Sequence, residues 1–183
     1  MIIKNEKQIH ENIIGCLAKN FGCKIIKEEC TILTFYNIDQ IENEVSFLQP
    51  DIVGYNSKNY SLYIVEAKKY THIGTKGVCS VIGQIIIDNI GLSLFGLKDL
   101  RHYLKSGDEK LGNKPIEQIF FYIALPNIAN GGVNEKIRPS VEMILKQLHK
   151  ELNKQFGVFE IFELDKPARV YKNLIAEPIL LRV

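Results

Sequence analysis

Two short apolar segments joined by a polar loop, within residues 49–69, constrain the fold of this chain more than any other feature. Residues 51–55 and 60–67 have the length and composition of strands, and residues 56–59 have the composition of a turn. The stretch therefore predicts an antiparallel hairpin. Because the start of one strand of a hairpin lies beside the end of the next, we expect Asp51 next to Glu66. Period-two geometry places Lys68 on the same face as Glu66.

Two carboxylates and an ammonium group at one point have a chemical use. Two carboxylates at close range repel each other unless a hard cation such as Mg²⁺ lies between them. A metal held in this way polarises a phosphoryl oxygen and supplies hydroxide, while a nearby lysine positions the water or stabilises negative charge. The alternative interpretation is a solvated strand end with a surface ion pair of little energetic value.

The same residues resemble a known family. Pro50-Asp51, a fourteen-residue spacer and Glu66-Ala67-Lys68 are similar to the signature of the PD-(D/E)xK, or restriction-endonuclease-like, nuclease superfamily. The resemblance implies an α/β fold with an αβββαβ core, in which a mixed central sheet is flanked by helices. This core covers roughly residues 5–125 of a single domain over residues 1–183, and residues 126–183 add a helix and strands that the resemblance does not explain.

The resemblance also implies roles for individual residues. Asp51 and Glu66 would ligate Mg²⁺, or Mn²⁺ as a substitute, together with the backbone carbonyl of Ala67. Lys68 would orient or activate the attacking water. Gln84 would position Glu66, Lys68 or a water molecule.

A helix is predicted over residues 5–20. Its apolar stripe recurs every four residues, and Glu6 lies in line with this stripe whereas Glu11 lies well away from it. Related families carry a glutamate on the helix before the hairpin, so the resemblance implies that Glu6 contacts the metal or its waters. The alternative is that Glu6 complements the helix dipole. The stripe consists of Ile9, Ile13, Leu17 and Phe21.

Residues 78–97 form a nearly continuous apolar run. Gln84 and Asp88 near its middle argue against a membrane span, because a carboxylate at mid-bilayer is costly. We expect a helix buried on most sides, with a polar and small-residue stripe that borders the metal cluster. Several branches of the superfamily have I-G-Q on this helix, as at residues 82–84 here, and some place a tyrosine where this chain has Asp88. Asp88 is therefore either an extra carboxylate near the metal or the partner of Gln84 in the core. The stripe consists of Gly77, Ser80, Gln84, Asp88 and Gly91.

The charge distribution favours a phosphate-bearing partner next to the hairpin. The net charge is only +2, but residues 67–87 contain three lysines and no acid. A loop with two glycines at residues 70–77 allows phosphate to approach backbone N–H groups. We expect Lys69, Thr75 and Lys76 to contact the phosphates of DNA, although Lys76 alone is equally well read as part of a solvated turn.

The four cysteines include no C-x-x-C pair, and the N-terminus has no secretory signal pattern, so we expect reduced thiols in a cytoplasmic protein. The even spacing of Cys16, Cys23 and Cys30 after His10 suggests zinc, but these residues spread over a helix, a loop and a strand. Burial as small apolar side chains is the better interpretation.

The remaining elements follow from pattern. We expect one bent strand or two short strands over residues 23–36, a loop over 37–46, a helix over 97–104 and a loop over 106–115. Residues 118–125 read as a central strand covered on both faces. A helix over 135–155 and strands over 158–164 and 169–183 complete the chain.

The expected function is a Mg²⁺-dependent endonuclease that cleaves DNA, in duplex form, in restriction, defence or repair, because most of the resembled superfamily acts on DNA. A homodimer would suit paired cleavage of a duplex, and no membrane association is expected. The alternatives are a nucleic-acid-binding subunit that does not cleave and a protein-interaction subunit. For the latter, Ile86 and Leu94 on the apolar helix would matter more than Glu66.

Overall fold

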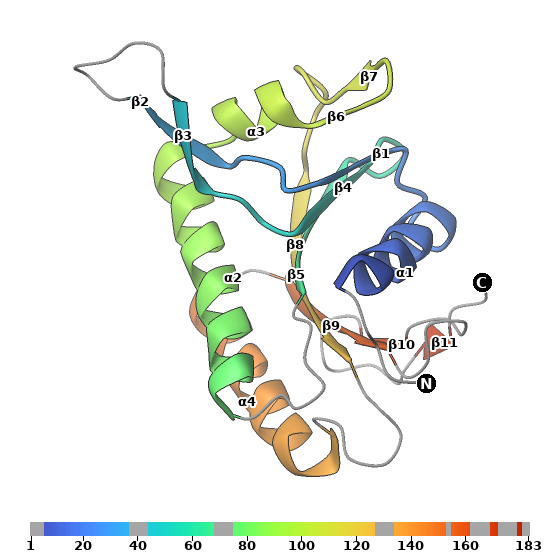
Figure 1. Ribbon diagram of the computed structural model, residues 1–183, viewed down its shortest axis with the longest axis vertical. Coiled ribbons are helices and arrows are strands. Elements are labelled where there is room, and N and C mark those ends of the chain that lie inside the picture. The colour runs from blue at the N-terminus through green and yellow to red at the C-terminus, as the bar shows by residue number, and fades with distance from the viewer. Residues whose placement is uncertain are drawn as a thin grey trace.

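A mixed β-sheet forms the centre of the computed structural model, which describes residues 6–36, 44–67, 75–126, 134–152, 155–161, 169–171 and 179–180. Its five main strands lie in the order β1, β4, β5, β8 and β9, and two short strands, β10 and β11, extend it beyond β9 (Figure 1). The pairs β1–β4 and β4–β5 are antiparallel, whereas β5–β8 and β8–β9 are parallel. The strands are β1 (Ile25–Glu28), β4 (Ile52–Asn56), β5 (Ser61–Ala67), β8 (Gln118–Pro126), β9 (Gln155–Ile161), β10 (Arg169–Tyr171) and β11 (Ile179–Leu180).

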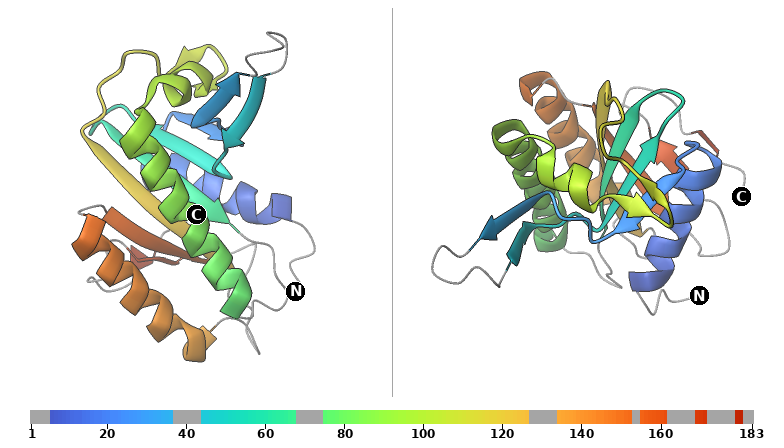
Figure 2. Two further views of the ribbon diagram at one scale, coloured as in Figure 1. Left: turned by 90° about the vertical axis from the view of Figure 1, so that its left-hand side faces the viewer. Right: turned by 90° about the horizontal axis from the view of Figure 1, so that it is seen from above.

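Four helices cover the two faces of this sheet. One face carries α1, and the opposite face carries α2 and α4, with α3 next to the end of α2 (Figures 1 and 2). Each face therefore has its own apolar core, as expected for an α/β protein with a covered sheet. The helices are α1 (Glu6–Lys19), α2 (Thr75–Phe95), α3 (Lys98–Tyr103) and α4 (Asn134–Leu152).

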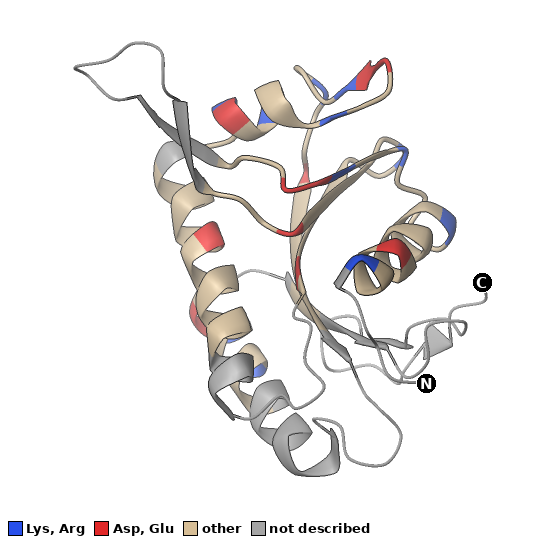
Figure 3. Ribbon diagram, viewed as in Figure 1, with Lys and Arg blue, Asp and Glu red and all other residues tan. Residues whose placement is uncertain are grey.

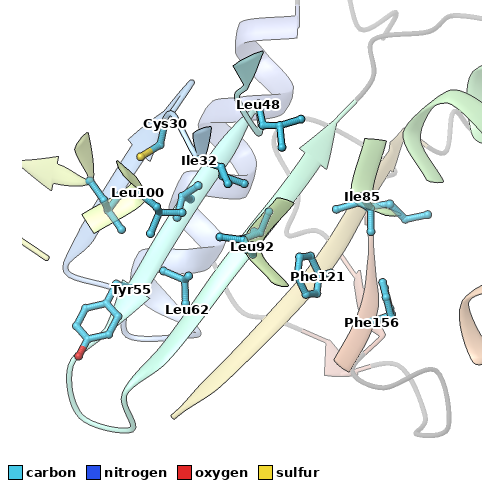
Figure 4. Close-up of a cluster of buried hydrophobic side chains, with 14 of the residues drawn as sticks. Cys30, Ile32, Leu48, Tyr55, Leu62, Ile85, Leu92, Leu100, Phe121 and Phe156 are labelled. Atoms are coloured by element: carbon cyan, nitrogen blue, oxygen red, sulfur yellow. The ribbon is translucent and has the colours of Figure 1, made fainter. Parts of the chain in front are cut away.

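The pleat of the central strands divides side chains between these two cores. In β5, Leu62 and Ile64 join the core under α2, whereas Tyr63 and Val65 join the core under α1. Successive residues of a strand point to opposite faces of the sheet. The even-numbered side chains of β5 therefore face α2, and the odd-numbered ones face α1. Figure 4 shows the larger core, in which Leu62, Phe121 and Phe156 from three strands lie in one cluster with Ile85 and Leu92 of α2.

The predicted hairpin and the first helix are confirmed. β4 and β5 pair antiparallel across a turn at residues 57–60, so the strands begin one residue later than expected. All four residues of the predicted α1 stripe are buried, and Glu11 is exposed. An apolar spacing of four residues was sufficient to orient α1 because the helix packs on a single surface.

The prediction for the segment before the hairpin is partly wrong. Residues 37–46 were expected to form a loop, but a strand, β3 (Glu44–Leu48), begins inside this range and pairs with β2 (Leu33–Tyr36) in a separate two-stranded sheet. Residues 23–36 form two strands, which belong to different sheets. Residues 106–115 likewise include parts of a small hairpin of β6 (Lys105–Ser106) and β7 (Glu109–Lys110) instead of only a loop. β3 has five residues and β6 and β7 have two each, so any strand pattern in them is too short to stand out from the polar residues around it.

The C-terminal segment continues the main sheet. β8 lies between β5 and β9 and is parallel to both, which confirms its prediction as a central strand. α4 packs beside β9 and contributes Leu145 to the same core as α2. In the described residues, the last third of the chain is therefore built onto the same sheet as the hairpin.

We predict that Gly157→Ala destabilises the protein by about 1–3 kcal/mol, because a Cβ at Gly157 in β9 would overlap the ring of buried Tyr122. Urea denaturation measures this change in the free energy of unfolding. Gly15→Ala in α1 is the matched control, since a Cβ there meets nothing within 4 Å. The control should stabilise the protein by roughly 0.5–1 kcal/mol. Equal stability of the two variants would contradict the packing described for β8 and β9.

Candidate active site at the end of the hairpin

Asp51 and Glu66 lie next to each other where β4 begins and β5 ends. The register pairs Ile52 with Val65, so the next position along the hairpin brings Asp51 opposite Glu66. The backbone N–H of Ala67 donates a hydrogen bond of 2.6 Å to Asp51 Oδ2. The predicted proximity of the two acidic residues is confirmed, and the last residue of β5 holds the aspartate carboxylate in place.

Both carboxylates belong to the face of the sheet that α2 covers. Glu66 has the parity of Leu62 and Ile64, and Asp51 has the parity of Val53 and Tyr55, all of which lie in the α2 core. Figure 3 shows acidic positions where β4 begins, where β5 ends and in the middle of α2. Glu66 is only 1% exposed, so protein atoms and not water surround its side chain.

Asp88 supplies a third carboxyl group from α2. It is fully buried, and its Oδ1 accepts a hydrogen bond of 3.1 Å from Gln84 Nε2, one turn earlier on the helix. The carboxyl group of Glu66 lies close enough to Asp88 to affect its ionisation, and so does the charge of Asp51. The polar stripe predicted for this helix therefore does border the hairpin site at Gln84 and Asp88.

The pKa of Asp88 is raised from 3.8 to about 6, mainly by burial. The charge of Asp51 also acts to raise this pKa, whereas the contacts with Glu66 and Gln84 act to lower it.

The segment before β2 adds a contact that the sequence did not indicate. The backbone N–H of Glu29 donates a hydrogen bond of 3.0 Å to the carbonyl oxygen of Asp51. Glu29 has a φ of 50°, which is uncommon for a residue with a side chain. This backbone contact involves no side-chain chemistry, so no sequence motif would have revealed it.

Several predicted site residues fall outside what the structure describes. Lys68 and Lys69 lie in residues 68–74, beyond the described part of the chain. Glu6 is the first residue of α1, and Thr75 and Lys76 begin α2, but their side chains are not among those described. The roles expected for these five residues stay predictions.

The donor chemistry of the site fits a hard divalent cation. Clustered carboxylate oxygens suit Mg²⁺, and Asp88 Oδ2 is buried with no hydrogen-bond partner among the described residues. Within these residues, no group of three or more His, Cys, Asp and Glu side chains is arranged to hold a metal ion. Any Mg²⁺ would therefore rely on one or two of these carboxylates, with backbone oxygen and water completing its shell, as is common for this ion.

The cysteines do not form a zinc site in the described residues. Cys16 and Cys23 belong to the core under α1, whereas Cys30 belongs to the core on the opposite face of the sheet. All three are buried free thiols, and burial raises the pKa of Cys23 and of Cys30 to about 12. His10 Nδ1 lies 2.8 Å from Glu28 Oε1. The interpretation of these cysteines as small apolar side chains is confirmed.

The burial expected for α2 is partly wrong. Ile87, Ile90 and Leu94 are 47%, 46% and 71% exposed, although the helix was expected to be buried on most sides. Apart from the polar stripe the run is apolar, so no amphipathic pattern identifies the outward face of the helix from sequence. Among the described helices, none combines the length and the apolar character needed to span a bilayer.

The raised pKa of Asp88 predicts how stability changes with pH. Between about pH 4 and pH 6 the folded protein holds a proton that the unfolded chain has released, so rising pH removes stability in this window. Asp88→Asn carries no titrating group, so its stability relative to the wild type should increase from pH 4 to pH 6 and then stay constant. Urea denaturation in EDTA measures both proteins. A difference that does not change with pH would show that Asp88 has an ordinary pKa.

Comparison with protein-family models, with curated proteins and with solved structures finds no match for the chain. The function must therefore be argued from the residues and geometry of the site itself.

Proposed function

We propose that the protein is a Mg²⁺-dependent nuclease that hydrolyses phosphodiester bonds of duplex DNA at the end of the β4–β5 hairpin. The observation that carries the proposal is the placement of Asp51 beside Glu66, on one face of two adjacent strands, with the Asp51 carboxylate held by the N–H of Ala67. A half-buried aspartate beside a buried glutamate suits a cation-dependent reaction.

Each residue has a defined part in this proposal. Asp51 and Glu66 would hold the metal through carboxylate oxygens, and the carbonyl of Ala67 points to the same side of β5 as the N–H that contacts Asp51. Bound Mg²⁺ supplies Lewis-acid polarisation of a phosphoryl oxygen and lowers the pKa of water. Lys68 would orient the attacking water, with Glu6 assisting through water. Lys69, Thr75 and Lys76 would bind phosphates beside the site.

The order of elements supports a restriction-endonuclease-like core. Apart from the β2–β3 pair, the short helix α3 and the β6–β7 hairpin, the chain runs as helix, strand, hairpin, helix and strand from α1 to β8. We extend the proposal to this fold because the predicted metal ligands occupy the hairpin, and a helix with a Gln follows it. The exonuclease-like branch of the superfamily is among those with a tyrosine at the position of Asp88, so Asp88 argues against assigning the chain to that branch.

The catalytic test uses supercoiled plasmid, linear duplex, single strand and a four-way junction, each with Mg²⁺, Mn²⁺ or EDTA. The wild type should cleave duplex DNA only with a metal ion. Asp51→Ala should lower the rate by ~100-fold or more because it removes a ligand oxygen from the site, and Lys68→Ala should lower it by about 10²–10⁴-fold.

Asp108→Ala is the matched control, because it removes an exposed carboxylate in the turn between β6 and β7. It should cleave at the wild-type rate. Absence of cleavage of every substrate by the wild type, together with absence of Mg²⁺ binding by calorimetry, would reject the nuclease proposal.

A second candidate function is that of a protein-interaction subunit that dimerises through α2. The exposed Ile87, Ile90 and Leu94 occur at i, i+3 and i+7, and therefore form one apolar row on the helix. A contiguous exposed apolar row is typical of an interaction surface. Ile86 packs partly against the core, so Leu94 is the better of the two positions named from sequence.

We predict that Leu94→Glu weakens self-association at least ~10-fold, since a charge would be buried at the centre of an apolar contact. Sedimentation velocity over a concentration series measures this change. Ala18→Glu adds the same charge at an exposed position of α1, on the opposite face of the sheet, and it should leave association unchanged. A wild type that stays monomeric throughout the series would exclude the dimer.

A further inference from the structure

Asp88 is an unusual residue to find in the middle of a helix that packs on a sheet. It has 0% exposure, and Oδ2 has no hydrogen-bond partner among the described residues. Burial of a carboxylate without full compensation costs free energy that an apolar side chain would not. Packing alone therefore does not account for an aspartate at this position.

The surroundings of Asp88 all belong to the candidate active site. Its contacts are the amide of Gln84 on the helix side and the carboxyl group of Glu66 on the strand side, and Asp51 adds a like charge. The resemblance implies that Gln84 positions Glu66, Lys68 or a water molecule. In the structure, Gln84 Nε2 instead donates to Asp88 Oδ1.

We propose that Asp88 is a positioning residue that holds the carboxyl group of Glu66 in place for the metal, and that Gln84 acts on Glu66 through Asp88. The proposal rests on the nuclease function proposed above. In this proposal the hairpin supplies the metal ligands, and α2 supplies the groups that orient Glu66. Asp51 is fixed by the N–H of Ala67, whereas the carboxyl group of Glu66 is oriented from the helix.

Positioning explains the geometry better than direct metal binding by Asp88. Gln84 already occupies Oδ1, and no three acidic residues of the described chain form a metal-binding group. Partners that hydrogen-bond to a ligand fix its orientation, and their loss usually costs about 10–100-fold in metal affinity or activity. An effect of this size is expected for Asp88.

Calorimetric titration of the full-length protein with Mg²⁺, and separately with Mn²⁺, tests the proposal without a nucleic-acid substrate. Asp88→Ala should weaken binding about 10–100-fold, because Glu66 loses its partner. Asp88→Asn should stay within roughly fivefold of the wild type, since its amide can donate to Glu66 and its oxygen can accept from Gln84. Gln84→Leu should weaken binding as well, which covers the case in which Asp88→Ala does not fold.

Asn89→Ala is the matched control for a buried polar truncation. Asn89 is 3% exposed and lies one residue along the same helix, about 100° away from Asp88 around the helix axis. Thermal denaturation should show a loss of stability in this variant, while its metal affinity stays at the wild-type value. A purely structural role of Asp88 would likewise change stability and leave metal affinity unchanged.

The outcomes separate this inference from the function on which it rests. Wild-type affinity in Asp88→Ala, with normal metal binding by the wild type, would overturn the positioning role and leave the nuclease proposal intact. Equal loss in Asp88→Asn and Asp88→Ala would identify Asp88 as a direct ligand and also overturn it. A wild type that binds neither metal would overturn the nuclease proposal and the inference together.

Discussion

The hydrogen bond from the Ala67 N–H to the Asp51 carboxylate fixes the arrangement on which the site depends. It is made by backbone at the end of β5, so it requires the β4–β5 register and no particular side chain at position 67. A shift of one residue in this register would move Asp51 relative to Glu66 and would also turn the apolar residues of one strand to the wrong face. The two cores therefore enforce the geometry of the carboxylates. The packing of Leu62 and Val65 on opposite faces is part of what makes the site possible.

The energetic cost of the site is local and is offset by the rest of the sheet. Glu66 and Asp88 are both buried, and burial together with the nearby charge of Asp51 disfavours the ionised form of Asp88. Large apolar side chains from β4, β8 and β9 lie in the same core as Ile85 and Leu92 of α2 (Figure 4). Their burial offsets the free-energy cost of burying Glu66 and Asp88. Departures from apolar packing in an otherwise consistent core are concentrated at functional sites in natural proteins. This contrast supports a functional interpretation of the acidic pair over a structural one.

The parts of the fold that sequence could predict are those with a strong local period. The α1 stripe and the β4–β5 hairpin have such a period, and the structure confirms both. β3 was missed because its first residues, starting at Glu44, follow a polar and acidic segment and because its partner β2 lies outside the main sheet. The outward face of α2 could not be predicted, since Ile87 and Ile85 are equivalent in hydrophobicity and only tertiary packing distinguishes them. For the same reason, the sequence identified Gln84 and Asp88 as a polar pair but could not determine that Asp88, and not Gln84, faces Glu66.

The two surfaces of α2 make the nuclease and the dimer compatible. The helix directs Asp88 toward the hairpin, whereas Ile87 and Leu94 point outward, so a partner on the exposed row would not displace the residues that border the site. In the proposed nuclease each subunit of a dimer would offer one hairpin site, so cleavage of both strands of a duplex at one encounter would require two subunits in a fixed relation. A rigid helix that contacts the site on one side and a second subunit on the other would set the distance and orientation between the two sites. An exposed apolar row behind an acidic site is therefore consistent with a single function, in which α2 both orients Glu66 and sets the distance between two sites.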